Sequence, residues 1–180
     1  VFLSTFSLFS RDFDYRDIPV QDGGRIKPLD TFARNQLLSI YGKRSLKLEN
    51  LSAIDWLNNL LADPHNGFNQ KVFKLRNPEV VQSLGLEWDN IHTYTYHEIL
   101  GGLENQKELL IQIQQKPDDE LSIMEGQLKE LHTNFQKFAN MWWHLKIIPP
   151  ASENSEDAWI SPWEVESEHA LTHNQRNLLF

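Results

Sequence analysis

The chain has 180 residues, 40% of them hydrophobic and 23% charged, which is typical of one globular domain and excludes collagen-like, low-complexity and wholly disordered chains. It contains no cysteine, which excludes disulfides, Cys-ligated metal sites, a thiol nucleophile and a covalently attached c-type haem. The net charge of -8 argues against a nucleic-acid partner, because phosphate contacts need a basic face.

The opening run, Val1 to Ser10, is apolar but shorter than the roughly 18 residues that span a bilayer. It lacks the basic start and the small-residue cleavage site of a signal peptide. We interpret residues 1–17 as a separate segment, either the outer end of a membrane helix or a terminal element of the core. Residues 18–180 are expected to form a single domain, and the uncapped apolar ends indicate a piece of a longer protein.

Charge is distributed unevenly along the chain. Residues 1–47 carry eight Lys/Arg and five Asp, so the remaining 133 residues carry nine Lys/Arg and twenty Asp/Glu. The basic N-terminal part either neutralises the acidic remainder of the same fold or forms a binding patch, and both interpretations stay open.

Residues 18–28 predict a small hairpin, because Asp22-Gly23-Gly24 has the residues of a tight turn. The flanks are short, and the prolines at their ends limit the pairing. A helix follows, with Asp30 or Thr31 as its expected cap and Gly42 at its end.

The middle of the chain alternates short helices with loops and weak strands. A helix capped by Ser52 should stop at Asp63-Pro64, followed by a loop over residues 65–70. Lys71 to Arg76 indicates a weak strand, and Asn77-Pro78 opens a short helix that Gly85 ends. His92 to Tyr96 is prone to β structure, and a further helix should begin at His97-Glu98.

The strongest pattern is an apolar seam between residues 121 and 145. The spacing alternates three and four residues, as on one face of a long helix, through Leu121, Met124, Leu128, Leu131, Phe135, Phe138, Trp142 and Leu145. Leu103, Leu110 and Ile113 form a looser stripe upstream, and Pro117-Asp118-Asp119 should break the first helix and cap the second. We therefore predict a mainly α domain of several short helices plus a long αα-hairpin over about residues 103–146, with a small N-terminal β-ribbon.

Histidines and tryptophans supply two groups of candidate binding residues. His169 and His173 are four residues apart, which places both rings on one helix face as a metal site requires; a solvated helix face is the alternative. His92 and His97 give a weaker signal, and His132 and His144 fall off the seam and should face solvent. Trp142 belongs to the seam and to the core, whereas Trp143, like Trp159 and Trp163, is a candidate for contact with a partner or a membrane interface.

Catalysis finds little support, because the chain has no nucleophile elbow, Walker loop or dinucleotide fingerprint. A hydrolase or other enzyme whose site is assembled from scattered residues stays open. The hairpin combines a tight turn with cations and a helix N-terminus, which suits a carboxylate or propionate as well as a purely structural clasp. The candidate binding residues are Asp22, Gly23, Gly24, Arg25, Lys27, Asp30, Arg34 and Trp143.

The segment Ile18-Pro-Val-Gln-Asp-Gly-Gly-Arg-Ile-Lys-Pro-Leu-Asp-Thr-Phe-Ala-Arg34 resembles one found in membrane proteins of system II cytochrome c assembly, of the ResB/ResC or CcsB/CcsA type. Later segments resemble the same family in the same order: Asn77-Pro78-Glu79-Val80, Leu84-Gly85-Leu86, Pro149-Pro150 and Trp159-Ile160-Ser161-Pro162. The first segment is the specific one.

That family moves haem across the membrane and presents it to apocytochrome c. Its transmembrane histidines and tryptophan-rich haem motif are not matched by this sequence. The resemblance therefore implies a non-enzymatic domain on the periplasmic face of a bacterial inner membrane, which docks apocytochrome c or another assembly subunit. It implies no cofactor on this domain, although the parent protein would handle haem. A His-based metal- or haem-binding module and a coiled-coil interaction module built on the seam remain alternatives.

Overall fold

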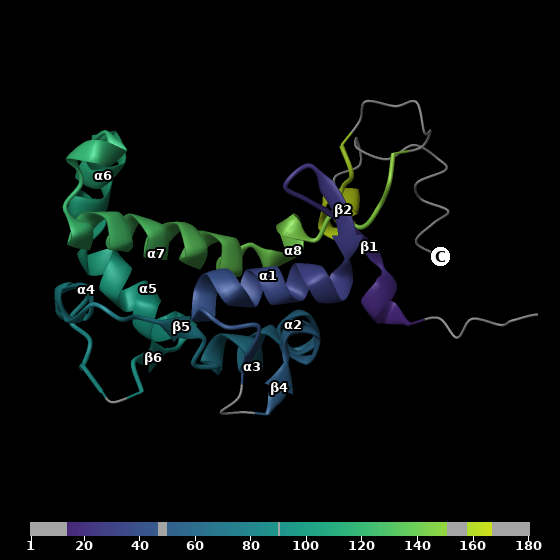
Figure 1. The fold of residues 1–180 in the computed structure, drawn as a ribbon, viewed down its shortest axis with the longest axis horizontal. Helices are drawn as coiled ribbons and strands as arrows, with labels where there is room; N and C mark the ends of the chain where they lie inside the picture. Colours follow the sequence, from purple (N-terminus) through teal and green to yellow (C-terminus); the bar gives the residue numbers. More distant parts are fainter. Residues whose placement is uncertain (1–13, 47–49, 90, 151–157, 167–180) are drawn as a thin grey trace, which may run out of the picture.

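A computed structural model describes residues 14–46, 50–89, 91–150 and 158–166. Within these residues it contains eight α-helices and three two-stranded antiparallel sheets, which confirms the predicted mainly α class with a small N-terminal β-hairpin. The longest helices, α1 (Leu29–Tyr41) and α7 (Ile123–Ala139), lie side by side along the long axis (Figure 1). Helices α4 to α6 gather at one end, and the hairpin and α8 lie at the other (Figure 1).

The N-terminal hairpin has the predicted position and turn. After a 3₁₀ turn, η1 (Tyr15–Asp17), strands β1 (Pro19–Asp22) and β2 (Arg25–Pro28) pair antiparallel. Gly23 and Gly24 take φ values of 60° and 73°, the left-handed conformation that a two-residue hairpin turn requires. The prediction of a small β-ribbon is confirmed.

Helix α1 begins earlier than the sequence predicted. Leu29 N–H donates to the carbonyl of Ile18 (2.8 Å), so the hairpin leads directly into the helix and Pro28 takes the N-cap position. The predicted cap at Asp30 or Thr31 is therefore wrong, and Asp30 instead forms an ion pair with Arg34 one turn later. The predicted end at Gly42 is confirmed by its φ of 76°.

The next helices show one correction. Strands β3 (Ser45–Leu46) and β4 (Leu51–Ser52) pair, and α2 (Ala53–Ala62) follows with Ser52 as its predicted cap. Residues 65–70 were expected to form a loop, but most of them belong to α3 (Pro64–Asn69). The reason is local: Asp63 accepts from Asn66 N–H, and proline at the first helical position needs no donor partner.

The middle segments largely follow the prediction. Strands β5 (Phe73–Lys74) and β6 (Thr93–Tyr94) pair with each other, and α4 (Pro78–Ser83) is capped by Asn77. Helix α5 (Tyr96–Asn105) begins one residue before the expected start, because Thr95 and Glu98 form a capping box.

The predicted αα-hairpin exists, but it is shorter and its caps differ. It consists of α6 (Lys107–Gln115) and α7, with η2 (Asp118–Glu120) between them. Ser122, rather than an Asp, caps α7. A break at Gln106 separates α6 from α5, and a break at Asn140 separates α7 from α8 (Met141–His144). Near the end of the described chain, Pro162–Glu166 form a 3₁₀ turn, η3.

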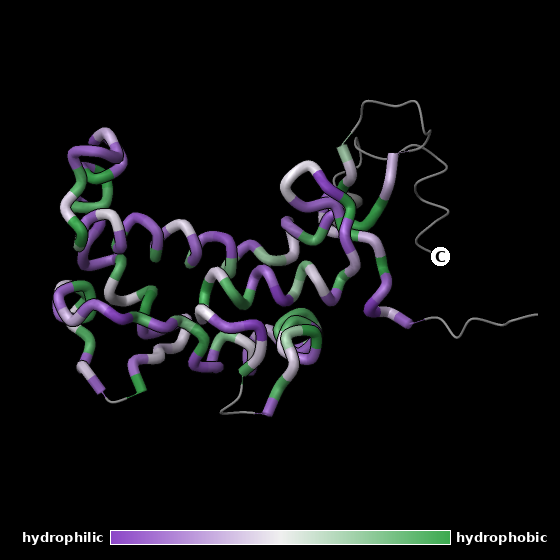
Figure 2. Tube along the Cα trace, viewed as in Figure 1, coloured by the Kyte–Doolittle hydropathy of each residue, from purple (hydrophilic) through white to green (hydrophobic). Residues whose placement is uncertain are grey.

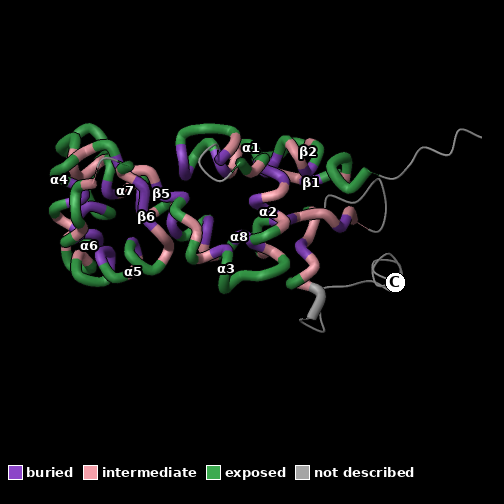
Figure 3. The backbone as a smooth tube through the Cα atoms, turned by 90° about the horizontal axis from the view of Figure 1, so that it is seen from below, coloured by how far each residue is buried: buried purple, intermediate pink, exposed green. Residues whose placement is uncertain are grey.

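The apolar seam of α7 supplies the centre of the core. Leu128, Leu131, Phe135 and Phe138 are buried, and helices α1, α4, α5 and α6 of the same chain contact α7. Along α7 hydrophobic and hydrophilic positions alternate, and buried segments gather where α7, β5 and β6 meet (Figures 2 and 3). Four rings surround Phe138: Trp56, Phe68, Phe73 and Tyr96. The chain's own helices thus cover these four positions of the seam, whereas Leu121, Met124 and Trp142 are half-buried.

In the described part of the chain, the helices are too short or too polar to cross a bilayer. The apolar run in which the sequence suggested the end of a membrane helix lies outside the described residues.

Candidate functional site

An apolar groove lies between α5, α6 and α7, at the end of the molecule opposite the β-hairpin (Figure 1). Its volume is about 310 Å³. The walls consist of Leu100, Leu103, Leu110, Ile111 and Phe135. Most of these residues also belong to the core, so the groove is a depression in a packed surface rather than a gap between loose elements.

Polar side chains line the rim of this groove. The His132 ring lies between the amides of Gln114 and Gln136, with N···N separations of 3.5 and 3.3 Å. Partial burial lowers the pKa of His132, which favours the neutral form of the imidazole. Glu104 and Lys107 complete the rim with opposite charges.

The sequence patterns did not indicate this groove. His132 was expected to face solvent because it lies off the seam, but it is half-buried at the rim. Ile111 follows the buried Leu110 and yet is largely exposed at the mouth. An apolar depression with a few amide and imidazole groups at its edge suits one or two apolar side chains of a polypeptide, whose backbone the rim can bind.

The hairpin residues named by the sequence lie together, but their charges are paired locally. Lys27 Nζ lies 2.8 Å from Asp22 Oδ2, and Arg34 Nε lies 2.9 Å from Asp30 Oδ2. Arg25 is exposed beside the two turn glycines. Two of the cations that would attract an anion therefore already have carboxylate partners, which favours the structural clasp over the anion site.

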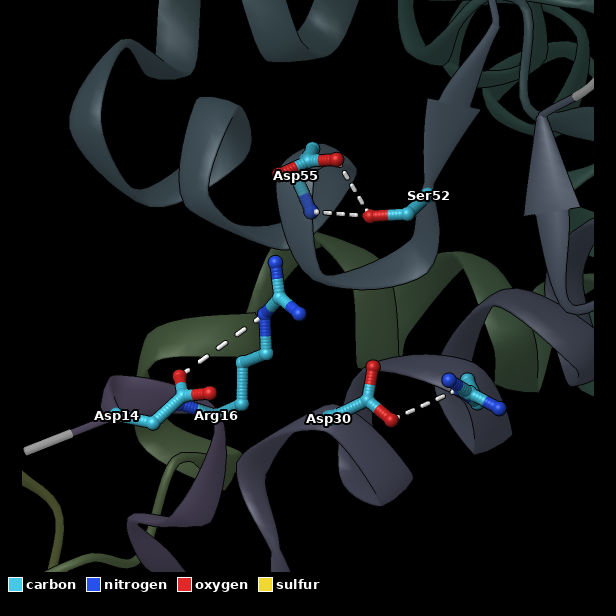
Figure 4. A network of polar contacts seen from close by, with 6 residues as sticks. Asp14, Arg16, Asp30, Ser52 and Asp55 are labelled. Atoms are coloured by element: carbon cyan, nitrogen blue, oxygen red, sulfur yellow. Dashed lines mark hydrogen bonds and ion pairs between the residues drawn. The ribbon is translucent and has the colours of Figure 1, made fainter. Parts of the chain in front are cut away.

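Charged side chains near η1 and the starts of α1 and α2 are also paired with groups close to them in the sequence. Arg16 points from Asp14 toward the start of α2, where Ser52 and Asp55 bond to each other (Figure 4). Arg16 and Asp14 approach only to 3.9 Å and are exposed, so this pair contributes little stability. The basic N-terminal part is thus at least partly neutralised by its own aspartates.

Trp143 in α8 lies at the hairpin end of the molecule and is exposed. Its neighbour Trp142 is only half-buried, with its ring centroid 6.0 Å from Phe68 and 6.5 Å from Trp163. Trp163 is also exposed. The structure therefore brings Trp143 and the hairpin to the same end, together with a second exposed tryptophan.

The proposed metal ligands His169 and His173 lie outside the described residues. Among the described residues there is no group of three or more His, Asp or Glu side chains that could hold a metal ion. His92 stacks on Trp88 at 3.9 Å, whereas His97 meets Phe68 edge-on, so these two histidines serve different contacts.

A second cleft of about 310 Å³ lies between α1, β5 and α7. Lys74, Arg76 and Glu130 contribute charges of both signs to it. Arg76 lies against Gly42, at the C-terminal end of α1, where a cation is favourable to the helix dipole.

No protein-family model matches the chain, and no curated protein matches its sequence.

Proposed function

We propose that the chain is the periplasmic docking domain of a system II cytochrome c assembly membrane protein, and that it binds apocytochrome c or a partner subunit beside the site of haem delivery. The proposal starts from the resemblance of residues 18–34, which fold as one continuous unit of hairpin and helix start. The domain's role in this proposal is binding rather than catalysis, and haem belongs to the membrane-embedded part of the parent protein.

The apolar groove is the observation that carries the docking role. Ile111 is 48% exposed at its mouth, and burying that surface under a partner's apolar side chain is favourable. The imidazole of His132 and the amides of Gln114 and Gln136 line the rim and can form hydrogen bonds with a peptide backbone. These properties suit an unfolded client such as apocytochrome c, which exposes apolar side chains and unpaired backbone.

The test is a calorimetric titration of the full chain with an apocytochrome c fragment that carries Cys-x-x-Cys-His. We expect saturable binding, which Ile111→Asp should weaken by about tenfold or more because it places a charge in the apolar mouth. Ile123→Asp is the matched control, because Ile123 is 80% exposed at the start of α7 and is not part of the groove wall.

A second peptide, with both Cys and the His replaced, separates the client from other partners. Loss of binding with this peptide supports recognition of the haem-attachment segment. Absence of binding at high micromolar concentration would sink the docking role, and equal losses from Ile111→Asp and Ile123→Asp would remove the groove as its site.

A further inference from the structure

His132 lies at the apolar groove together with hydrophobic side chains of three helices. On α7 it follows the buried Leu131 and precedes Phe135, which forms part of the groove wall. Leu100 of α5 and Leu110 of α6 line the same groove. His132 itself is half-buried there. An apolar side chain that fills the groove therefore removes more of the imidazole from water.

The hydrogen-bonding partners of the ring favour its neutral form. Nε2 of Gln114 lies 3.5 Å from Nδ1 of His132, and Nε2 of Gln136 lies 3.3 Å from the other ring nitrogen. A neutral imidazole accepts through one of its nitrogens, so it satisfies one of these amide donors. An imidazolium donates through both nitrogens and, in this arrangement, satisfies neither.

The charged residues around His132 do not compensate a positive ring. Glu104 of α5 and Lys107 of α6 line the groove with opposite charges. On α7 itself, Lys129 precedes His132 by one turn and is paired with Asp118 at 2.8 Å. Among the described residues, no charged group contributes to the lowered pKa of His132, and burial is its cause.

We propose that the groove binds apolar side chains more tightly while His132 is neutral, so that protonation of His132 weakens their binding. The inference deepens the proposed docking function and rests on it for the apocytochrome segment. The linkage itself applies to any apolar group that closes the groove, because it depends only on the covering of the ring.

The direction of the pH dependence follows from the free and bound states. Covering the ring disfavours its charged form, so the pKa of His132 should be lower with the groove filled than with it open. Binding is then strongest above the pKa of the open groove and weakens as the pH falls through it. In the open groove this pKa already lies below the ordinary value of 6.5.

The first test uses the full chain and N-phenyl-1-naphthylamine, a neutral probe that fluoresces in apolar sites. Proton NMR follows the ring of His132, which is assigned by its loss in His132→Gln. We expect the ring to titrate at lower pH with saturating probe than without it. The affinity for the probe should fall about three- to tenfold between pH 7.5 and pH 5, since one unit of pKa corresponds to a factor of ten.

Two variants separate this ring from other titrating groups. His132→Gln should make the affinity for the probe nearly independent of pH. His144→Gln is the matched control, because burial also lowers the pKa of His144 but this residue belongs to α8, remote from the groove. It should keep the full pH dependence.

The Cys-x-x-Cys-His peptide is titrated in parallel, and its own histidine contributes equally with every variant. If the probe shows the linkage but the peptide does not bind, the proposed function fails and this inference stands. If the peptide binds with the same pH dependence to the parent chain and to His132→Gln, the inference fails and docking stands.

Three results with the probe would overturn the proposal. One is a His132 ring that titrates at the same pH with and without the probe. Another is the same pH dependence in the parent chain and in His132→Gln. The third is absence of probe binding at any pH, because the groove would then not accept an apolar group.

Discussion

Gly101 and Gly102 are neighbours in α5 with different surroundings. A Cβ atom at Gly102 would lie 2.7 Å from Leu84 Cβ and 2.9 Å from the Leu84 carbonyl oxygen, closer than atoms in contact can approach. A Cβ at Gly101 would meet nothing within 4 Å. Gly102 is therefore the point at which α5 packs closely against the end of α4, whereas Gly101 only lowers the helix propensity.

These surroundings predict opposite effects of one substitution. Gly102→Ala should lower the free energy of unfolding by about 1–3 kcal/mol, because the added methyl group forces α5 away from Leu84. Gly101→Ala should raise it by about 0.5–1 kcal/mol, because alanine favours the helix and the site is open. Urea denaturation measures both, and effects of the same sign would contradict this packing.

The role of Asp30 could not be decided from its position in the sequence. Its type and place suggested a helix cap, and the same carboxylate is equally suited to pair with a cation one turn later. In the structure the N–H of Leu29, the first residue of α1, donates to the carbonyl of Ile18. The helix therefore begins before Asp30, and the Asp30 carboxylate pairs with Arg34 instead of capping the helix.

At the scale of elements, Glu125 joins the two helices of the αα-hairpin. Its carboxylate accepts from Ser122 N–H at the start of α7 and lies 2.6 Å from Lys116 Nζ at the end of α6. The hydrogen bond to Lys116 and the bonds with Ser122 lower the pKa of Glu125 from 4.5 to about 2. The charged carboxylate is thus the form that the folded hairpin favours.

This arrangement predicts a pH dependence of stability. Because the pKa of Glu125 is lower in the folded chain, its contribution is complete above the ordinary value of 4.5 and is lost as the pH falls toward about 2. Glu125→Gln should therefore lower the melting temperature at pH 7, and the difference from the parent chain should shrink as the pH falls through this range.

Thermal melts of both chains between pH 7 and pH 2 provide the measurement. Glu120→Gln is the control, because Glu120 is an exposed carboxylate in the same connection. A difference that stays constant with pH would show that the Glu125 carboxylate does not act in this way.

Some helix ends are set by neighbouring residues in the sequence, and others are set by residues far away in it. Four helix ends depend on residues of the same turn, and the sequence predicted each of them. Two are the N-caps Ser52 and Asn77, and two are the left-handed glycines Gly42 and Gly85. The break at Gln106 is different, because its side-chain amide donates to the carbonyl of Ser83 (2.6 Å), which is 23 residues away in the sequence. No local pattern contains that partner, so the sequence suggested a continuous stripe.

At the scale of the whole molecule, Gln21 connects the N-terminal hairpin to the C-terminal part of the described chain. Its side chain accepts from Trp159, 138 residues away, and beside this contact Ile148 and Ile160 exchange two backbone hydrogen bonds of 3.1 and 3.0 Å. The hairpin, α8 and η3 therefore form one end of the fold through contacts that close a very long loop.

Gln21→Ala should loosen this end without unfolding the domain. The loss of one hydrogen bond of about 1 kcal/mol predicts roughly fivefold faster hydrogen exchange at the Ile160 amide, with little change in the urea midpoint. Gln82→Ala, at an exposed position of α4, should leave exchange at Ile160 unchanged. Unaltered protection of Ile160 in Gln21→Ala would mean that the Gln21 side chain does not hold this segment.

The sequence by itself determined the helical class, the hairpin turn, most caps and the seam of α7, because each depends on residues within a few positions of one another. The seam's periodicity also predicted which side chains of α7 would be buried. It left open what would cover the seam, since periodicity is the same for a partner chain and for the chain's own helices.

Only the tertiary structure decided the groove and the packing of the hairpin against the C-terminal part of the described chain. The groove needs α5, α6 and α7 together, and the exposed Ile111 has the same character in the sequence as its buried neighbour Leu110. The packing of the hairpin needs residues 21 and 159 in contact. Both depend on which distant segments pack together to bury the most apolar surface, and local propensity does not encode that choice.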